Sequence, residues 1–407
     1  MLARQFRIAA GALACAVAVA GCHGGDKDAY PTWTLEPRSY TPREGSSNAY
    51  DTYALAAQDV EQKAPDLVKR VSFFPGHRAE AEKLIGATVD KVMRATHETC
   101  TFEFVPHKPF EPVPYQRGWR MIGRVFLWRV EDGCRSGNFD KAIANAEAGT
   151  KFGFGLTGGS AIDASLGLAV ADDIRRALAP YLAKMSAVQL DRLGKGFKTV
   201  LAEKPAISTA IRHEQDSALL MIQFLQDSVK TGDLKKVQEK LGPEVNETVR
   251  YLDGVASNET KRKAFFEGLA KSAAEEIGLV EQQSMEPAST RKIEHKKSSD
   301  AWKSLTKHVA GTARPLLDLN DATVARTRLL ILYAEVFRIN KNGKPFPRSL
   351  AAFSPELTID PYSGAPLIYS ADTAQFSIYS VGSNGQDDGG DTDATFTKPD
   401  LKLEIGD

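Results

Sequence analysis

The chain has 407 residues with 52 basic and 52 acidic side chains, so its formal net charge is zero. This length is sufficient for two or three domains with substantial cores. The balanced charge argues against nucleic acid as the main partner, because nucleic-acid-binding proteins present a strongly basic face.

The N-terminus has the pattern of a signal peptide over residues 1–21. Arg4 and Arg7 precede an apolar run of thirteen residues, Ile8–Ala20. A membrane-spanning helix needs about 20 apolar residues, so this run is too short and indicates a cleaved signal. Its removal takes away two basic and no acidic side chains, which leaves 50 basic and 52 acidic.

The end of the apolar run resembles the lipobox of bacterial lipoproteins, Val19-Ala20-Gly21-Cys22. In that family the cysteine thiol receives diacylglycerol, the signal is removed, and the exposed amine takes a further acyl chain such as palmitate. The resemblance implies that Cys22 is the lipid-attachment residue and that the lipid membrane is a partner. His23 follows where an Asp would favour the inner membrane, so we expect the periplasmic face of the outer membrane. A plain secretory signal with a chance cysteine is the alternative.

A tether and then a helical domain are expected after the cysteine. Residues 22–49 are polar and rich in proline, glycine and serine, as in a flexible tether. Residues 50–280 carry apolar side chains at three- and four-residue spacing, which predicts helices. The predicted helical segments are Tyr50–Thr99, Tyr115–Gly133, Ala161–Met185 with a kink at Pro180, a helix that Ser186 and Gln189 cap, Ser208–Val229 and Glu244–Leu279. Four prolines predict an extended path over Cys100–Pro114.

The turn at Gly137-Asn138 resembles that of a tetratricopeptide-type helical hairpin. Glycine ends the first helix, asparagine caps the second, and Phe139 and Ala142 are expected to pack the two helices together. Thr231–Leu234 echoes the same pattern faintly. No 34-residue period extends further, so the sequence predicts helical hairpins without establishing a repeat array.

Two cysteines, Cys100 and Cys134, remain beyond the proposed lipid-attachment site. In an oxidising envelope compartment such a pair is a disulfide candidate, which would stabilise the fold by about 3.5–4 kcal/mol. Two buried thiols are the alternative, and the sequence favours the bridge.

The C-terminal region changes character after a charged linker and connecting helix over residues 281–319. In residues 320–407, Asn320 can cap a helix over Asp321–Ile339. Short β-type runs follow at Leu357–Ile359, Leu367–Tyr369, Phe376–Val381 and Leu401–Ile405, with a turn at Asp360–Gly364 between the first two. The expected fold class is therefore mostly α, with a helical-hairpin body followed by a small α+β domain.

This C-terminal region resembles the globular domain of the major pseudopilin of type II secretion. The resemblance rests on Asp360-Pro361-Tyr362-Ser363-Gly364, Tyr379-Ser380-Val381-Gly382-Ser383-Asn384-Gly385 and Asp388-Gly389-Gly390-Asp391, within Ala322–Asp407. It implies a helix packed on a small antiparallel sheet, with calcium in the last loop. The whole chain also resembles large bacterial envelope proteins that join a helical region to this ending. A pseudopilin needs an N-terminal hydrophobic helix to polymerise, and here a lipobox stands in its place.

The candidate calcium ligands are four carboxylates, Asp387, Asp388, Asp391 and Asp393, in a glycine-rich loop. Calcium prefers six to eight oxygen ligands in a flexible arrangement, which such a loop can supply. A solvated acidic loop is the alternative. The spacing lacks the ligand order of an EF-hand, and the expectation depends partly on the pseudopilin resemblance.

Other motifs do not indicate a cofactor or a catalytic site. Gly153–Gly158 fits G-x-G-x-x-G, but the preceding segment is helical, so we interpret it as a joint between packed helices. His213-Glu214 is interpreted as a polar helix face that pairs with Arg212. No organic cofactor and no catalytic residue are predicted.

Three functions remain open. The first is a non-catalytic envelope lipoprotein whose helical hairpins bind or organise a protein partner, with a calcium-stabilised C-terminal module. The second is a component of a secretion or pilus-like apparatus. The third is an enzyme of unknown type with its site in the helical domain, which a deep pocket with converging titratable residues would favour.

Overall fold

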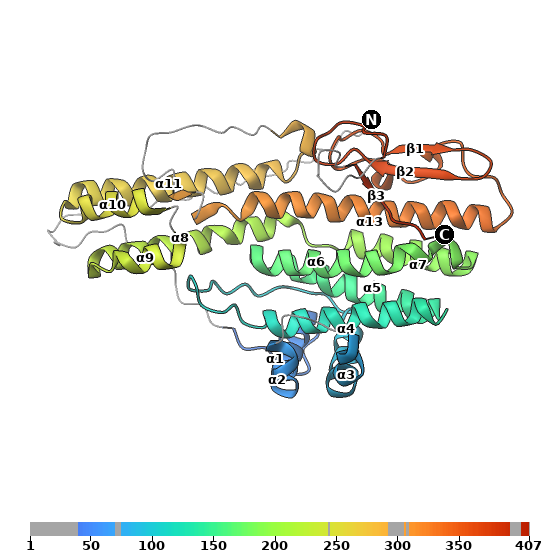
Figure 1. Ribbon diagram of the computed structural model, residues 1–407, viewed down its shortest axis with the longest axis horizontal. Helices are drawn as coiled ribbons and strands as arrows, with labels where there is room; N and C mark the ends of the chain where they lie inside the picture. The colour runs from blue at the N-terminus through green and yellow to red at the C-terminus, as the bar shows by residue number, and fades with distance from the viewer. Residues whose placement is uncertain are drawn as a thin grey trace, which may run out of the picture. The chain divides into compact units, whose positions relative to one another are not determined.

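Helices form most of the part of the chain that the structure describes. The computed structural model describes residues 40–69, 75–242, 245–291, 305–306, 309–390 and 400–406. A small three-stranded antiparallel sheet near the C-terminus accompanies the helices (Figure 1). The expected fold class, mostly α with a small α+β region, is confirmed.

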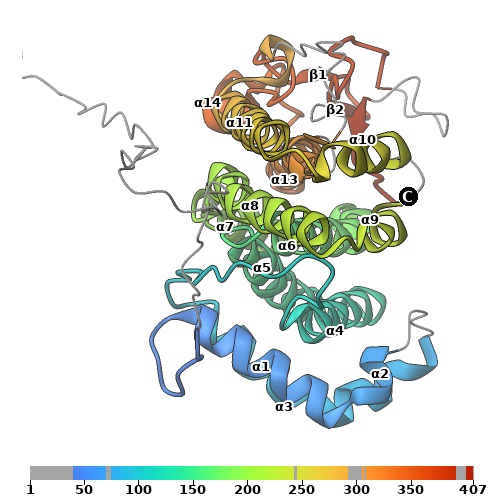
Figure 2. The ribbon, with the colours of Figure 1, turned by 90° about the vertical axis from the view of Figure 1, so that its left-hand side faces the viewer.

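The first half of the chain contains a series of helical elements. They are α1 (Ala49–Lys63), α2 (Pro65–Lys69), the 3₁₀ turn η1 (Pro75–His77), α3 (Arg78–Ala95), α4 (Gln116–Arg135), α5 (Phe139–Leu156), α6 (Ala161–Leu178), the 3₁₀ segment η2 (Ala179–Lys184) and α7 (Ala187–Ala202). Figure 2 shows α4, α5 and α6 next to one another, in the order of the chain.

The second half contains longer helices and the sheet. The helical elements are α8 (Ile207–Thr231), α9 (Leu234–Leu241), α10 (Asn246–Ala256), α11 (Glu259–Gln283), η4 (Ala288–Thr290), α13 (Ala313–Lys341), η5 (Leu350–Ala352) and α14 (Pro355–Thr358). The strands are β1 (Ile368–Ala371), β2 (Phe376–Ser380) and β3 (Leu401–Lys402).

The predicted hairpin turn between α4 and α5 is confirmed. Gly137 adopts a left-handed backbone with φ of 72°, which glycine tolerates because it has no Cβ. The Asn138 side chain then accepts a hydrogen bond from the Lys141 amide and caps α5. A Cβ added to Gly133 would lie 3.0 Å from the Ala142 Cβ, so the two helices approach each other closely at this turn.

Glycines also bring α5 and α6 together, which confirms the interpretation of Gly153–Gly158 as a helix joint. A Cβ on Gly153 would lie 2.5 Å from the carbonyl oxygen of Gly167. A Cβ on Gly167 would lie 2.0 Å from the carbonyl oxygen of Gly153. The two backbones therefore touch at a point that admits no side chain.

Two helix boundaries differ clearly from the sequence expectation. The helix predicted over Ala161–Met185 ends at Leu178 and continues as η2, because Pro180 cannot donate the amide hydrogen bond of an α-helix. α13 begins at Ala313, so Asn320 lies inside the helix and is buried instead of capping it. Pro315 is tolerated in the first turn, and burial of the apolar side chains Leu316 and Leu317 favours the longer helix.

The expected strand over Leu357–Ile359 is also wrong, because most of it forms the short helix α14. Pro355 is the first residue of that helix, a position whose backbone angle proline already has. Only Ile359 pairs in β fashion, through an isolated bridge to Pro366. The predicted turn after it is confirmed, since the Gly364 amide donates to the carbonyl oxygen of Asp360 at 2.8 Å.

The sheet packs on α13, as a helix-on-sheet arrangement requires. The strand order is β1-β2-β3, with Ile368 opposite Tyr379 and Tyr379 opposite Lys402. The Tyr333 hydroxyl of α13 donates to the carbonyl oxygen of Ile378 at 3.2 Å. The Phe376 ring of β2 lies 5.0 Å from the Phe337 ring of α13.

The buried core is continuous from α1 to the C-terminal sheet. One cluster of buried apolar side chains includes Tyr50 of α1, Leu330 of α13 and Leu403 after β3. An ion pair of 2.8 Å between Lys198 of α7 and Glu335 of α13 lies beside it. The helical region and the C-terminal sheet thus share one core, although the sequence predicted a linker between them.

Candidate functional site

A cavity of the helical body lies where the extended segment between α3 and α4 meets the start of α6. Its volume is about 270 Å³. Figure 1 shows the extended segment running alongside α4. Six aromatic rings and three titratable side chains are among its lining residues: Tyr40, Tyr50, Phe102, Phe104, Tyr115, Trp119, Glu103, His107 and Asp163. We call this cavity the aromatic pocket.

The rings of the aromatic pocket pack against one another. The Tyr50 ring lies 4.3 Å from that of Phe102, and the Tyr115 ring lies 5.5 Å from that of Trp119. These distances are typical of attractive aromatic pairs. The Trp119 indole nitrogen donates to the carbonyl oxygen of Tyr53 at 2.9 Å, so its polar atom is satisfied away from the pocket.

The glycine-rich turn between α5 and α6 allows Phe102 to close the pocket from one side. A Cβ on Gly159 would lie 2.5 Å from the Phe102 ring and 2.8 Å from the Asp163 carboxylate. A Cβ on Gly158 would lie 3.0 Å from the Phe102 Cβ. Side chains at these two positions would push the extended segment away from α6, so the turn shapes the pocket.

Asp163 contributes a buried carboxyl group to the pocket. Ser160 and Asp163 form a capping box at the start of α6, in which the Ser160 hydroxyl donates to Asp163 Oδ2 at 2.7 Å. Asp163 Oδ1 has no hydrogen-bond partner within normal geometry among the described residues. The pKa of Asp163 is raised to about 6, chiefly by burial and also by the nearby Glu214 carboxylate, and the hydrogen bonds from Ser160 act against this rise.

Glu214 and His213 support the same end of α6, so their interpretation as a polar helix face that pairs with Arg212 is wrong. Glu214 is buried and accepts from the Ala161 amide at 3.0 Å and from the Thr312 hydroxyl. The His213 ring stacks on Phe104 at 4.1 Å, and its Nδ1 donates to the carbonyl oxygen of Gly159 at 3.0 Å. Arg212 instead pairs with Glu281 at 2.6 Å.

Tyr115 is held in a left-handed backbone conformation at the entrance to α4. Its φ is 66°, a region that side chains with a Cβ adopt at a cost of about 1–2 kcal/mol. Strained residues of this kind often occur at binding sites, where the surrounding structure holds them in place. In this chain the strained residue directs an aromatic ring into the pocket lining.

The residues of the aromatic pocket were not singled out in the sequence. One local signal existed, because Ser160-x-x-Asp163 has the spacing of a capping box before an apolar run. The rings come from two separate stretches of the chain, residues 40–50 and 102–119. No local pattern predicts that they converge.

The candidate calcium loop lies partly outside the described residues, since Asp391 and Asp393 are not described. Asp387 accepts from the Tyr379 hydroxyl at 2.8 Å, and Asp388 accepts from the Asn384 amide group at 2.8 Å. Within the described part of the chain, no group of three or more His, Cys, Asp or Glu side chains is placed to hold a metal ion.

Asp400 is an acidic residue of this region that the sequence interpretation missed. It is fully buried, and its Oδ2 accepts from the amides of Asp388 and Gly390 at 3.0 and 2.8 Å. Burial raises the pKa of Asp400, and the Asp388 and Asp387 carboxylates raise it further, against the two amide hydrogen bonds. Asp400 therefore fastens the described part of the loop to the start of β3.

The proposed lipid-attachment residue, Cys22, lies outside the described residues. No helix in the described ranges has an apolar stretch long enough to cross a membrane.

The disulfide between Cys100 and Cys134 is not formed, and both cysteines are free. Cys134 lies at the turn from α4 to α5, whereas the Cys100 thiol lies beside Gly155 near the other end of α5. The helix between these points is roughly 24 Å long at 1.5 Å per residue, whereas a disulfide needs Cα atoms within about 7 Å. Burial raises the pKa of each thiol to about 12, so both are protonated at neutral pH.

Comparison of this chain with protein-family models, with curated proteins and with solved structures finds no match.

Proposed function

We propose that this chain is a membrane-anchored envelope lipoprotein whose helical body binds a small organic cation, an amine or quaternary ammonium, in the aromatic pocket. The observation that carries the proposal is the lining itself, which combines six aromatic rings with a buried carboxyl group. The described lining residues include Glu103 and Asp163 but neither lysine nor arginine.

The chemistry of the lining favours a cation over a neutral or anionic ligand. The face of an aromatic ring attracts a cation, by about 0.5–1 kcal/mol at exposed sites and about 2 kcal/mol when both are desolvated. A carboxylate at the same site adds a charge-assisted hydrogen bond to an amine. The pKa of Asp163, about 6, means that this carboxylate is charged at neutral pH and protonated in mild acid.

An acid–base enzyme is the second candidate, and Asp163 is the observation that favours it. A carboxyl group with a pKa of about 6 has the proton affinity that general acid–base catalysis uses. Asp163 Oδ2, however, is engaged in the capping box of α6 with Ser160, which holds the carboxyl group in place as a fixed recognition group. Nuclear magnetic resonance of an amine incubated with the chain for hours distinguishes the two candidates. An enzyme would convert the amine into a product, whereas a binding protein would leave it unchanged.

Titration calorimetry with tetramethylammonium chloride tests the cation proposal on the full chain in a non-ionic detergent, with sodium chloride as the reference salt. Tyr115→Leu removes a pocket ring, and we expect the dissociation constant to rise about tenfold, which corresponds to about 1.4 kcal/mol. Asp163→Asn is expected to weaken binding similarly at pH 7.5 and to have no effect at pH 5.

Tyr251→Leu is the matched control, since Tyr251 is an exposed tyrosine of α10 outside the pocket lining. This variant should bind like the wild type. Equal binding by all three variants, or no binding by the wild type, excludes the aromatic pocket as a cation site.

The membrane anchor is proposed from the lipobox resemblance at Cys22. Acylation with several chains attaches a protein stably, because each buried methylene contributes about 0.8 kcal/mol. Replacing Cys22 with serine should move the chain from the membrane fraction to the soluble envelope fraction. Continued membrane association of Cys22→Ser would exclude acylation at this residue as the anchor. A separate flotation experiment tests whether the wild-type chain is found in the outer-membrane fraction.

Calcium in the C-terminal loop is proposed as a structural ligand, with Asp387, Asp388, Asp391 and Asp393 as candidate ligands. The burial of Asp400 beside Asp388 supports it, because a cation would offset the mutual repulsion of these carboxylates. Calcium should raise the melting temperature of the full chain more than magnesium does. The rise should disappear in Asp388→Asn and persist in Asp372→Asn, an exposed aspartate of another turn.

A protein partner is proposed for the exposed faces of the helical hairpins. Pull-down from intact envelopes with the wild-type chain, compared with Cys22→Ser, identifies partners that depend on the anchor. Recovery of secretion pseudopilins in such an experiment would instead favour the apparatus component.

A further inference from the structure

A second cavity, of about 260 Å³, lies at the opposite end of α6 from the aromatic pocket. Three parts of the chain enclose it: the last turns of α6 with the start of η2, the middle of α13, and the segment that contains β3. Its lining residues are Asp172, Arg175, Arg176, Ala179, Arg326, Leu401, Lys402, Leu403 and Glu404. We call it the arginine cleft.

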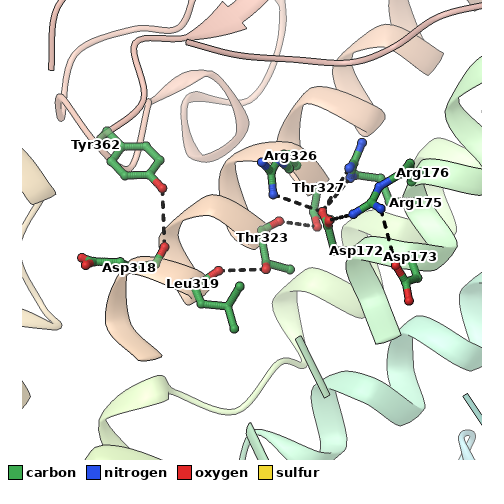
Figure 3. Close-up of polar contacts among 10 residues, drawn as sticks. All are labelled: Asp172, Asp173, Arg175, Arg176, Asp318, Leu319, Thr323, Arg326, Thr327 and Tyr362. Carbon is green, nitrogen blue, oxygen red and sulfur yellow. Dashed lines mark hydrogen bonds and ion pairs between the residues drawn. The ribbon is translucent and has the colours of Figure 1, made fainter. Parts of the chain in front are cut away.

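Asp172 holds three guanidinium groups in place (Figure 3). Its carboxylate accepts from Arg175 Nη2 at 3.0 Å, from Arg176 Nη2 at 2.8 Å and from Arg326 Nη1 at 3.4 Å. Arg175 and Arg176 belong to α6 itself, whereas Arg326 comes from α13, 154 residues away in the chain. One carboxylate therefore fixes donors from two helices around the same cavity.

The neighbouring polar side chains of α13 do not compete for a ligand. The Thr323 hydroxyl donates to the carbonyl oxygen of Leu319 at 2.8 Å, and the Thr327 hydroxyl donates to that of Thr323 at 2.7 Å. Figure 3 shows both hydroxyls directed along their own helix. The donors free to meet a ligand in the cleft are thus those of the arginines and Lys402.

Positive charge exceeds negative charge in the cleft. Its lining contains four cationic side chains, three arginines and one lysine, and two carboxylates, Asp172 and Glu404, which leaves a net charge of +2. Asp173, outside the lining, lies 3.8 Å from Arg176 and reduces the excess to +1 when it is counted. Burial and the neighbouring guanidinium groups lower the pKa of Arg175 despite its contact with Asp172.

Neutralisation of a helix end does not account for this arrangement. Arginines in the last turn of a helix stabilise the negative end of its dipole, and this explains Arg175 and Arg176. It does not explain Arg326 and Lys402, which reach the cleft from α13 and β3. Arg326 forms only one ion pair within the described part of the chain, to Asp172 at 3.4 Å, although a guanidinium carries five N–H groups.

We propose that the arginine cleft binds a phosphate group, with Arg176, Arg326 and Lys402 as the contacting donors and Asp172 and Arg175 as positioning residues. The planar fork of a guanidinium matches the oxygen geometry of phosphate and donates two parallel hydrogen bonds to it. A phosphate monoester carries a charge of about −1.5 to −2 at pH 7, opposite in sign to the excess of +1 to +2 in the cleft.

The phosphate has two possible sources, a free phosphate compound and a phospholipid headgroup. Both offer the same oxygens to the guanidinium groups. Glycerol 3-phosphate and glycerophosphoglycerol distinguish them, because the first is a free phosphomonoester and the second is the phosphodiester that a phospholipid headgroup presents. Tenfold tighter binding of the diester identifies the headgroup, whereas equal or weaker binding of the diester identifies a free phosphate compound. Both results support a phosphate site.

Calorimetric titration of the full chain with sodium phosphate at low ionic strength tests the proposal, with sodium chloride of the same ionic strength as the reference. Arg176→Gln is the principal variant, because the Arg176 side chain is 59% exposed and its loss leaves the core intact. We expect its dissociation constant for phosphate to rise at least tenfold. Lys402→Gln should cause a smaller rise, of about threefold.

Arg135→Gln is a matched control. Arg135 also lies in the last turn of a helix, pairs with an aspartate three residues earlier, and is 55% exposed. This variant should bind phosphate within twofold of the wild type. The proposal is overturned if Arg135→Gln weakens binding as much as Arg176→Gln, or if the wild type releases no heat beyond that of chloride.

Discussion

Helix α6 carries two buried aspartates, Asp163 near its start and Asp172 near its end, and they occupy opposite electrostatic environments. Asp163 is 2% exposed and Asp172 is 8% exposed, so burial alone does not distinguish them. The pKa of Asp163 is raised to about 6, whereas that of Asp172 is lowered. Burial acts in the same direction on both, so the difference comes from their partners.

The partners of the two carboxylates determine what each end of α6 can bind. Asp163 has hydroxyl and amide donors and a second carboxylate nearby, so it carries uncompensated negative charge into an aromatic pocket. Asp172 is surrounded by three guanidinium groups, so the cavity beside it carries excess positive charge. One helix thus presents a site suited to a cation and a site suited to an anion.

Removing the Asp172 carboxylate should have the largest effect. Asp172→Ala leaves Arg175 buried without its counterion, which costs about 3–5 kcal/mol for a broken buried pair. We expect a corresponding fall in the free energy of unfolding by urea. Asp191→Ala, which breaks exposed ion pairs with Lys195 and Arg338, is the control and should lower the free energy of unfolding much less. Similar losses in the two variants would mean that Asp172 does not organise the cluster.

A smaller effect is expected from a methyl group at the crossing of α5 and α6. Gly167→Ala places a Cβ 2.0 Å from the Gly153 carbonyl oxygen, so the helices must separate at a cost of about 1–3 kcal/mol. Because Gly167 lies between the two aspartates, both cavities should change together. Gly254→Ala has open space around its Cβ and should stabilise the chain by about 0.5–1 kcal/mol. Thermal melting of both variants measures the contrast.

Neutralising Asp163 should stabilise the protein, in contrast to Asp172. The folded state binds the Asp163 proton more tightly than the unfolded chain does, since folding raises the pKa from 3.8 to about 6. This contribution to stability is present below pH 3.8 and is lost as the pH rises through 6. Asp163→Asn should therefore be more stable than the wild type at pH 7.5 by about 1–2 kcal/mol.

The pH dependence distinguishes this effect from improved packing. The advantage of Asp163→Asn should shrink towards zero as the pH falls from 7.5 to 4, when melting temperatures of both proteins are compared. A constant advantage over this range would show that Asp163 is not a charged, destabilising group in the folded state.

The smallest effect is expected from a reducing agent. Cys100 and Cys134 are free and lie at different ends of the α4–α5 hairpin, so dithiothreitol should leave the melting temperature unchanged. Cys134→Ala should likewise behave the same with and without reductant. A fall in melting temperature with reductant would reveal a disulfide and contradict the described geometry.

Local sequence signals predicted the local structure well. Ser186 and Gln189 form the expected capping box, and Gly137 with Asn138 forms the expected hairpin turn. These features succeed because one residue and its near neighbours satisfy them. Asn320 failed as a cap for the opposite reason, since burial of Leu316 and Leu317 by distant helices extended α13 past it.

The sequence by itself determined the mostly helical fold, the small C-terminal sheet and the position of the tight turns, because periodicity, caps and turn residues act within a few residues. Only the tertiary structure decided the two cavities of α6. Arg326 reaches Asp172 across 154 residues, and Phe102 reaches Asp163 only because Gly159 leaves room for its ring. A charged side chain takes its electrostatic character from whichever groups the fold brings beside it, and local sequence does not contain that information.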